Sequence, residues 1–248
     1  MEKIQVLPVY KDTTEKIWLP VNCGDSKMEF AYPPIQGYHA AAYQAMAKDP
    51  EIRAARGIEL AVLPYAAYTN KQSLWEQIKK KFKARFIQSP HRALLLPKGS
   101  LPDKNLEGII IGTNTKQVRT SMSIPSSFDN WKQDGNIFYT PDKQRYFLPI
   151  GTFKFGEHTA KSFGQDAFAQ IILSPEGAAL YAKTAIDNNL KPYLLGLEVE
   201  KLKQPDQRVV MLHEGDGSLL LCCWVGDSGF NFTFGVRRSS SEAGAREQ

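Results

Sequence analysis

The spacing of hydrophobic positions changes along the chain, from mixed strand and helix patterns in the first third to strand patterns in the rest. Residues 3–10 and 16–21 are rich in β-branched and aromatic residues, and each run contains a proline. Because proline cannot donate to a ladder, both runs predict edge or bulged strands. Apolar residues at helical spacing predict a helix over 36–48, and the acids and proline of 49–51 predict a short helix that stops at Gly57.

Two further patterns complete the first third of the chain. The apolar run 58–65 predicts a strand. A helix then begins at a capping residue, Asn70 or Ser73, and continues to about Gln88, where Ser89 and the following proline end it.

Strand patterns dominate the remainder of the chain. One helix interrupts them, from the capping residue Ser174 through Pro175 to about Asn188. Turn residues bound the other apolar or alternating runs, and the last four of these runs have the spacing of an antiparallel meander. The expected strands lie at 92–99, 107–113, 117–124, 136–155, 193–202, 208–215, 218–226 and 230–238.

This order of elements predicts the fold class. Helices cluster early, strands dominate late, and the two do not alternate strictly. We therefore expect an α+β fold, with early helices packed on a mainly antiparallel sheet and a C-terminal strand meander. A single domain over residues 1–238 is expected, with a possible sub-boundary near 97–104, and the small polar residues of 239–248 predict a disordered tail.

The cysteine content and the lack of long apolar runs indicate in which compartment the protein works. The three cysteines, Cys23, Cys222 and Cys223, lack the number and spacing of a disulfide framework. Residues 1–12 are too polar for a signal peptide, and no run reaches the roughly 18 apolar residues of a membrane helix. These features predict a soluble protein in a reducing cytoplasm, with no membrane partner.

Most motifs of catalysis and cofactor binding are missing from the sequence. It contains no phosphate loop, no dinucleotide fingerprint and no Cys-x-x-Cys pair, and its four histidines show no metal-ligand spacing, so we assign neither cofactor nor metal residues. The sequence GDSG at 226–229 has the composition of a turn, and no histidine pattern suggests a base for its serine. Glu157 and His158 lie in a predicted glycine-flanked loop and give one alternative, a small hydrolase or transferase with a general base there.

Charge is far more concentrated than composition suggests. Residues 71–92 hold seven lysines and arginines against Glu76 alone, a net charge of +6 in a chain whose formal net charge is +5. One short segment therefore holds all of the excess positive charge. A field of this kind attracts polyanions such as nucleic acids, although a solvated helix face has a similar composition.

Helical geometry separates the aromatic from the basic residues of this segment. At about 100° per residue, Trp75, Ile78, Phe82 and Phe86 form one apolar arc that faces the core. The lysines cover the opposite face and both flanks. Arg85 falls inside the apolar arc, so either the helix ends before it or its side chain reaches along the surface to a partner.

The residues that could bind nucleic acid are the cations of this segment and of the last strand. Lysine holds phosphates rather than reading bases, so the segment is suited to a nucleic-acid backbone. Alternating aromatics of the last strand, Phe230, Phe232 and Phe234, share one face that either belongs to the core or stacks on bases. The candidate residues are Lys79, Lys80, Lys81, Lys83, Arg85, His91, Arg92, Arg237 and Arg238.

Together these patterns predict a non-catalytic nucleic-acid-binding protein that works as a subunit of a larger nucleoprotein complex. Single-stranded nucleic acid, and RNA above single-stranded DNA, suits the strand-rich half. The alternatives are the hydrolase or transferase with its loop Glu157 and His158, and a scaffold whose basic helix docks an acidic protein.

Overall fold

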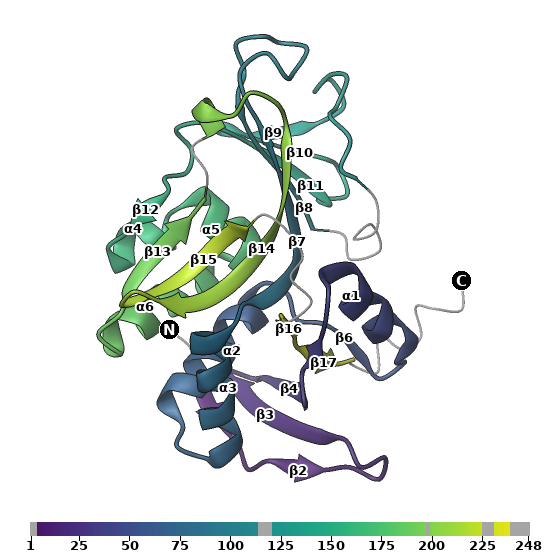
Figure 1. Cartoon of the computed structure of the whole chain (residues 1–248), viewed down its shortest axis with the longest axis vertical. Coiled ribbons are helices and arrows are strands. Elements are labelled where there is room, and N and C mark those ends of the chain that lie inside the picture. Colours follow the sequence, from purple (N-terminus) through teal and green to yellow (C-terminus); the bar gives the residue numbers. More distant parts are fainter. Residues whose placement is uncertain (1–3, 114–120, 197–198, 225–230, 239–248) are drawn as a thin grey trace.

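The structure, a computed structural model, describes residues 4–113, 121–196, 199–224 and 231–238. Helices pack beside two mainly antiparallel sheets, which confirms the predicted α+β class (Figure 1). Over the described residues, no helix is both long enough and apolar enough to cross a membrane. The helices are α1 (His39–Lys48), α2 (Ile58–Thr69), α3 (Ser73–Ala84), α4 (Ala160–Gly164), α5 (Ala167–Leu173), α6 (Pro175–Asp187) and the 3-10 helix η2 (Val199–Lys201).

The smaller sheet joins segments from both ends of the chain. Its strands are β1 (Ile4–Val6), β2 (Tyr10–Lys11), β3 (Ile17–Cys23), β4 (Ser26–Tyr32), β6 (Ile52–Ala54) and β17 (Gly235–Arg237). The prediction of an edge or bulged strand for residues 16–21 is wrong, because β3 pairs regularly between β1 and β4. Pro20 is tolerated there because it faces the break between β1, which pairs with residues 21–23, and β2, which pairs with residues 17–18.

The larger sheet runs through the rest of the molecule (Figure 1). Most of its pairings are antiparallel, and β13 with β15 and β16 with β7 are parallel. In spatial order its main strands are β12 (Gly156–Glu157), β13 (Lys191–Leu195), β15 (Ser218–Trp224), β14 (Asp206–Gly215), β7 (Ile87–Leu96), β8 (Gly108–Gly112), β11 (Arg145–Pro149), β10 (Ile137–Tyr139) and β9 (Lys132–Asp134), while β16 (Phe232–Thr233) pairs with β7 and β5 (Ile35–Gln36).

The C-terminal strand series is present, but its spatial order differs from its sequence order. β14 and β15 form an antiparallel hairpin, whereas β13 lies parallel to β15 on the far side of that hairpin. The last two strands then divide between the sheets, β16 in the larger and β17 in the smaller. The end of the chain therefore ties the two sheets together.

Two local predictions in the first third are wrong. Residues 58–65, expected as a strand, begin α2, which is buried around most of its circumference. A helix buried on all sides has no one-sided pattern, so its sequence resembles that of a buried strand. The short helix expected after Asp49 is replaced by β6, because residues 52–54 pair with β17 from the other end of the chain.

The basic helix α3 is shorter than predicted. It ends at Ala84 rather than near Gln88, and Arg85 already has an extended backbone (φ −152°, ψ 169°). Ser89 and Pro90, expected to end this helix, lie inside β7. The helix ends early because of a tertiary contact. Residues 87 and 88 pair with Leu212 and Met211 of β14, and this strand pairing replaces the last predicted turn of the helix.

One large hydrophobic core fills the space between the helices and both sheets. It includes Phe30 of β4, Phe82 of α3 and Tyr181 of α6. Alternate residues of β14 divide between two faces: Val210 and Leu212 belong to this core, whereas Val209 and Met211 face the other way. We call this second face of β7, β14 and β15 the outer face.

The single domain over residues 1–238 remains a prediction. Its possible sub-boundary, residues 97–104, lies in the connection between β7 and β8. The expected tail 239–248 and part of the expected strand 117–124 lie outside the described residues, and residues 121–124 are not in a strand.

Candidate nucleic-acid interface

Helix α3 separates an apolar face from a basic face as its sequence predicts. Trp75, Ile78 and Phe82 are fully buried, and Trp75 packs edge-on against Phe30 with ring centroids 6.4 Å apart. Lys80 and Lys83 are exposed. The apolar face fixes the orientation of the helix, so its lysines are held outside the core.

Three of the lysines make contacts within the protein. The Nζ atom of Lys79 lies 4.9 Å from the ring centroid of Tyr68, and that of Lys81 lies 4.1 Å from the ring centroid of Phe232. Lys83 forms an ion pair with Glu214, with Nζ and Oε1 3.2 Å apart. The basic face is thus anchored at its edges by aromatic rings and one acid.

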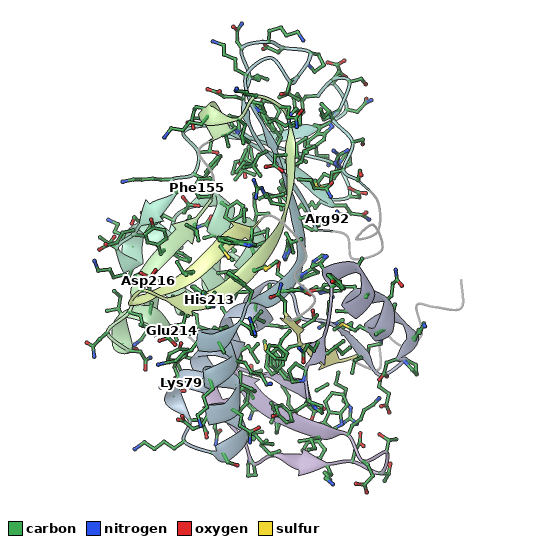
Figure 2. The ribbon with its side chains drawn as sticks, in the orientation of Figure 1. Lys79, Arg92, Phe155, His213, Glu214 and Asp216 are labelled. Carbon is green, nitrogen blue, oxygen red and sulfur yellow. The ribbon has the colours of Figure 1, made fainter. Side chains whose placement is uncertain are left out.

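Glu214 is the counter-ion that the sequence did not reveal. It lies at the end of β14, far from α3 in the chain, and its side chain is mostly buried. It also accepts a hydrogen bond from the hydroxyl of Tyr68. Burial of Tyr68 and this bond to Glu214 raise the pKa of Tyr68 well above its ordinary value. Figure 2 shows Lys79 on α3 beside the end of β14 that carries His213 and Glu214.

The structure shows which of the two alternatives for Arg85 holds. The helix ends before it, and its side chain is exposed rather than inside the apolar arc. Its backbone N–H caps α3 on the carbonyl of Lys81 at 2.9 Å, and its carbonyl contacts Nδ1 of His213 at 3.1 Å. Arg85 therefore connects the lysine face of α3 to the first residues of β7.

His91 does not lie on this surface. It is 4% exposed, and its Nδ1 atom lies 3.3 Å from the hydroxyl oxygen of Ser89. Burial, and to a lesser extent the charge of His39, lowers the pKa of His91 to about 3. A buried neutral imidazole cannot neutralise a phosphate, so His91 is not suited to a phosphate-binding surface.

Arg92 follows on the same strand but on the outer face. It lies directly opposite Gly112 of β8 and Val209 of β14. Directly opposed residues share a face of a sheet, so Arg92 belongs to the face that carries Val209. Figure 2 shows it further along β7 than the end of α3.

Arg237 is the last residue of β17 in the smaller sheet, and Arg238 follows it. Arg237 forms ion pairs with Asp12 at 3.1 Å and Glu29 at 3.2 Å, and its guanidinium lies 4.3 Å from the ring centroid of Trp18. The backbone N–H of Arg238 donates to the carbonyl of Glu51 at 2.8 Å. The structure thus uses Arg237 to hold the last strand against the first strands.

Aromatic side chains from β14, from β15 and from the residue before β7 meet beside Arg85. The ring centroid of Phe86 lies 4.6 Å from that of His213 and 5.4 Å from that of Trp224, and Phe86 and Trp224 are stacked with an angle of 30° between their planes. Trp224 is 45% exposed. We call Trp224, Phe86 and His213 the aromatic row. The sequence does not indicate this row, because its helical spacing places Phe86 in the apolar arc of a longer helix.

The two residues of the enzyme alternative have separate structural partners. Glu157 pairs with Lys191 on the neighbouring strand, with Nζ and Oε2 2.7 Å apart. His158 is 8% exposed, and its Nε2 atom contacts the carbonyl of Lys154 at 2.7 Å. This neighbourhood is also less irregular than the expected loop, because β12 precedes His158 and α4 begins at Ala160.

Among the residues that the structure describes, no group of three His, Cys, Asp or Glu side chains could hold a metal ion. The sequence GDSG at 226–229, interpreted as a turn, lies outside the described residues. No family model, no curated protein and no solved structure matches the chain.

Proposed function

We propose that the protein binds single-stranded nucleic acid without catalysing a reaction on it, with RNA favoured over DNA, as a subunit of a larger nucleoprotein complex. One observation carries the proposal: the lysine face of α3 leads through Arg85 directly to the aromatic row, whose Trp224 is exposed. Cations beside stacked aromatic rings are the usual surface for a single strand, which presents both phosphates and unpaired bases.

The basic face supplies the electrostatic part of this binding. Lys79, Lys80 and Lys81 lie in consecutive positions of one helix, and the Nζ atoms of Lys79 and Lys81 contact aromatic rings. Each cation that neutralises a phosphate releases a counter-ion, so affinity should fall steeply with salt. The outward side of this helix needs no rearrangement to meet a phosphate backbone.

The cellular setting belongs to the same proposal. We place the protein in the reducing cytoplasm, where Cys23, Cys222 and Cys223 remain thiols. All three are buried and free of disulfide bonds. Burial raises the pKa of Cys222 to about 12, which favours an unreactive thiol.

The test removes charge from α3 without disturbing its ion pair with Glu214. In the triple variant Lys79→Ala, Lys80→Ala, Lys81→Ala, Lys83 is kept. Binding of a fluorescent oligouridylate is followed by anisotropy over a range of salt concentrations. We expect affinity at physiological salt to fall about tenfold or more, and the log–log salt slope to become shallower by about 0.7 for each lost phosphate contact.

A matched control carries the same loss of charge elsewhere. Lys98, Lys132 and Lys203 are exposed and lie away from α3, so changing all three to alanine should leave most of the affinity and the salt slope intact. An equal loss of affinity in both triple variants would show that binding depends on the overall charge of the protein and not on α3. If wild-type protein retains neither RNA nor single-stranded DNA but co-purifies with an acidic protein after nuclease treatment, the scaffold alternative replaces our proposal.

A further inference from the structure

We propose that Glu214 limits the phosphate-binding lysines of α3 to Lys79, Lys80 and Lys81, because its carboxylate occupies Lys83. This inference rests on the proposed function, and it makes one acidic residue responsible for the number of phosphates that the helix holds. Lys83 belongs to the same basic run as the other three lysines and is exposed like Lys80. It differs from them in its partner, a carboxylate on a strand distant in the sequence.

The alternation of side chains along β14 directs Glu214 toward the helices. Successive residues of a strand point to opposite faces, so Glu214 shares a face with Val210 and Leu212 of the large core. Its side chain is 12% exposed, and each carboxylate oxygen has a partner. Oε2 accepts a hydrogen bond from the hydroxyl of Tyr68 on α2, and Oε1 lies 3.2 Å from Nζ of Lys83 on α3. A rotation of the carboxylate toward solvent would break both contacts.

Tyr68, which holds Glu214, is itself packed between side chains of α3. Its ring centroid lies 6.4 Å from that of Phe82, and the Nζ atom of Lys79 lies over the same ring. An ion pair between two exposed side chains opens readily, but here the acid is mostly buried. Removing Lys83 from a desolvated carboxylate is costly. A phosphate therefore competes for Lys83 with an anion that the fold already holds in place.

The contacts of Lys79 and Lys81 are of a different kind. Each ammonium group lies over an aromatic ring, that of Tyr68 for Lys79 and that of Phe232 for Lys81. A ring face attracts a cation but does not cancel its charge, so both lysines still present a positive charge to a phosphate. Lys80 is exposed. The ion pair with Glu214 thus separates Lys83 from the three lysines before it.

Phe232 has a structural place beneath Lys81, and it is partly buried against the large core. Phe234, two residues further on, is 2% exposed and belongs to the same core. Phe230 lies outside the described residues. For Phe234, the structure therefore shows the core environment rather than a surface on which bases could stack.

The experiment releases Lys83 and measures the number of phosphate contacts. Glu214→Gln keeps the size of the side chain and an oxygen for the hydroxyl of Tyr68, but it removes the charge that holds Lys83. We expect oligouridylate affinity to rise about fourfold at physiological salt, and the log–log salt slope to become steeper by about 0.7, as for one added phosphate contact. In the double variant Glu214→Gln, Lys83→Ala, the affinity and the slope should return to wild-type values.

Glu76→Gln provides the matched control, because it removes the same charge from α3 itself, two helical turns from Lys83. Its salt slope should equal that of the wild type. Acetylation of lysines, read by mass spectrometry, then identifies the side chains that the ligand covers. We expect bound oligouridylate to protect Lys80 in both the wild type and Glu214→Gln, but to protect Lys83 only in Glu214→Gln.

An unchanged salt slope in a folded Glu214→Gln protein would overturn this inference, and so would protection of Lys83 in the wild type. Either result leaves phosphate binding by the other lysines intact. Urea unfolding shows whether Glu214→Gln is folded, and if it is not, the pattern of protection in the wild type decides. If the wild type does not bind oligouridylate, or if the triple lysine variant binds it equally well, the proposed function fails together with this inference.

Discussion

At the scale of single residues, the cations of this chain lie in two different environments that the sequence does not separate. Lys80 on α3 is exposed to solvent, whereas Arg237 is ion-paired to Asp12 and Glu29 and stacked on Trp18. Both looked like candidates because both are basic and lie in basic surroundings. The difference depends on acids that are distant in sequence and adjacent only in the fold.

Arg237 should therefore matter for stability rather than for binding. Replacing it with methionine keeps most of the aliphatic stem but removes the pairs with Asp12 and Glu29, so we expect a loss of about 1–2 kcal/mol for this partly exposed cluster. Urea unfolding followed by fluorescence measures the change. Lys80→Ala, on an exposed site, should stay within about 0.5 kcal/mol of wild type. If a folded Arg237→Met protein bound the oligouridylate more weakly, Arg237 would contribute to binding after all.

At the scale of elements, local hydrophobic spacing predicts the helices that have one apolar face. It does not predict where a helix ends when pairing with a strand distant in the sequence sets that end. The buried face of α3 and the capped helix α6 follow from local spacing and capping, and both were predicted. The end of α3 was not, because β14 competes for residues 87 and 88. The same limit hid the aromatic row, since Trp224 and Phe86 meet only after β14 has paired with both β7 and β15.

Because α3 ends early, Phe82 and Phe86 should contribute different amounts to the free energy of unfolding. Phe82 is fully buried in the large core, so Phe82→Ala should cost about 3–5 kcal/mol. Phe86 is only partly buried and packs on the small cluster of the outer face, so Phe86→Ala should cost clearly less, about 1–2 kcal/mol. Denaturant titration of the two variants gives this contrast. Equal losses would indicate that both rings share one helical face, as in the longer helix that the sequence predicted.

At the scale of the whole molecule, a buried polar cluster lies where the helix α1 meets the larger sheet. Nε2 of His39 contacts the carbonyl of Ser89 at 2.9 Å, and the hydroxyl of Tyr43 donates to the carbonyl of Gln88 at 3.3 Å. His91 lies in the same region of β7. These groups are hydrogen-bonded inside the protein, so α1 is joined to the sheet by polar contacts as well as by apolar packing.

This cluster should make the fold sensitive to mild acid. Burial lowers the pKa of His91 to about 3, whereas an unfolded histidine titrates near 6.5. Between these values the unfolded chain binds a proton that the folded chain does not, so stability is complete above pH 6.5 and falls as the pH decreases toward 3. The slope is up to about 1.4 kcal/mol per pH unit for this one proton.

Urea unfolding at a series of pH values tests the role of His91. Carboxylates such as that of Asp12, whose pKa is lowered to about 2 chiefly by a hydrogen bond from Thr14, lose their contribution only at more acidic pH. The range from pH 6.5 to 4.5 is therefore the most informative for a histidine. We expect His91→Gln to lower stability at pH 7.5 but to flatten its decline over that range, because glutamine binds no proton. Ile186→Ala changes no titrating group and should keep the wild-type decline. An unaltered slope in His91→Gln would show that acid acts elsewhere in the molecule.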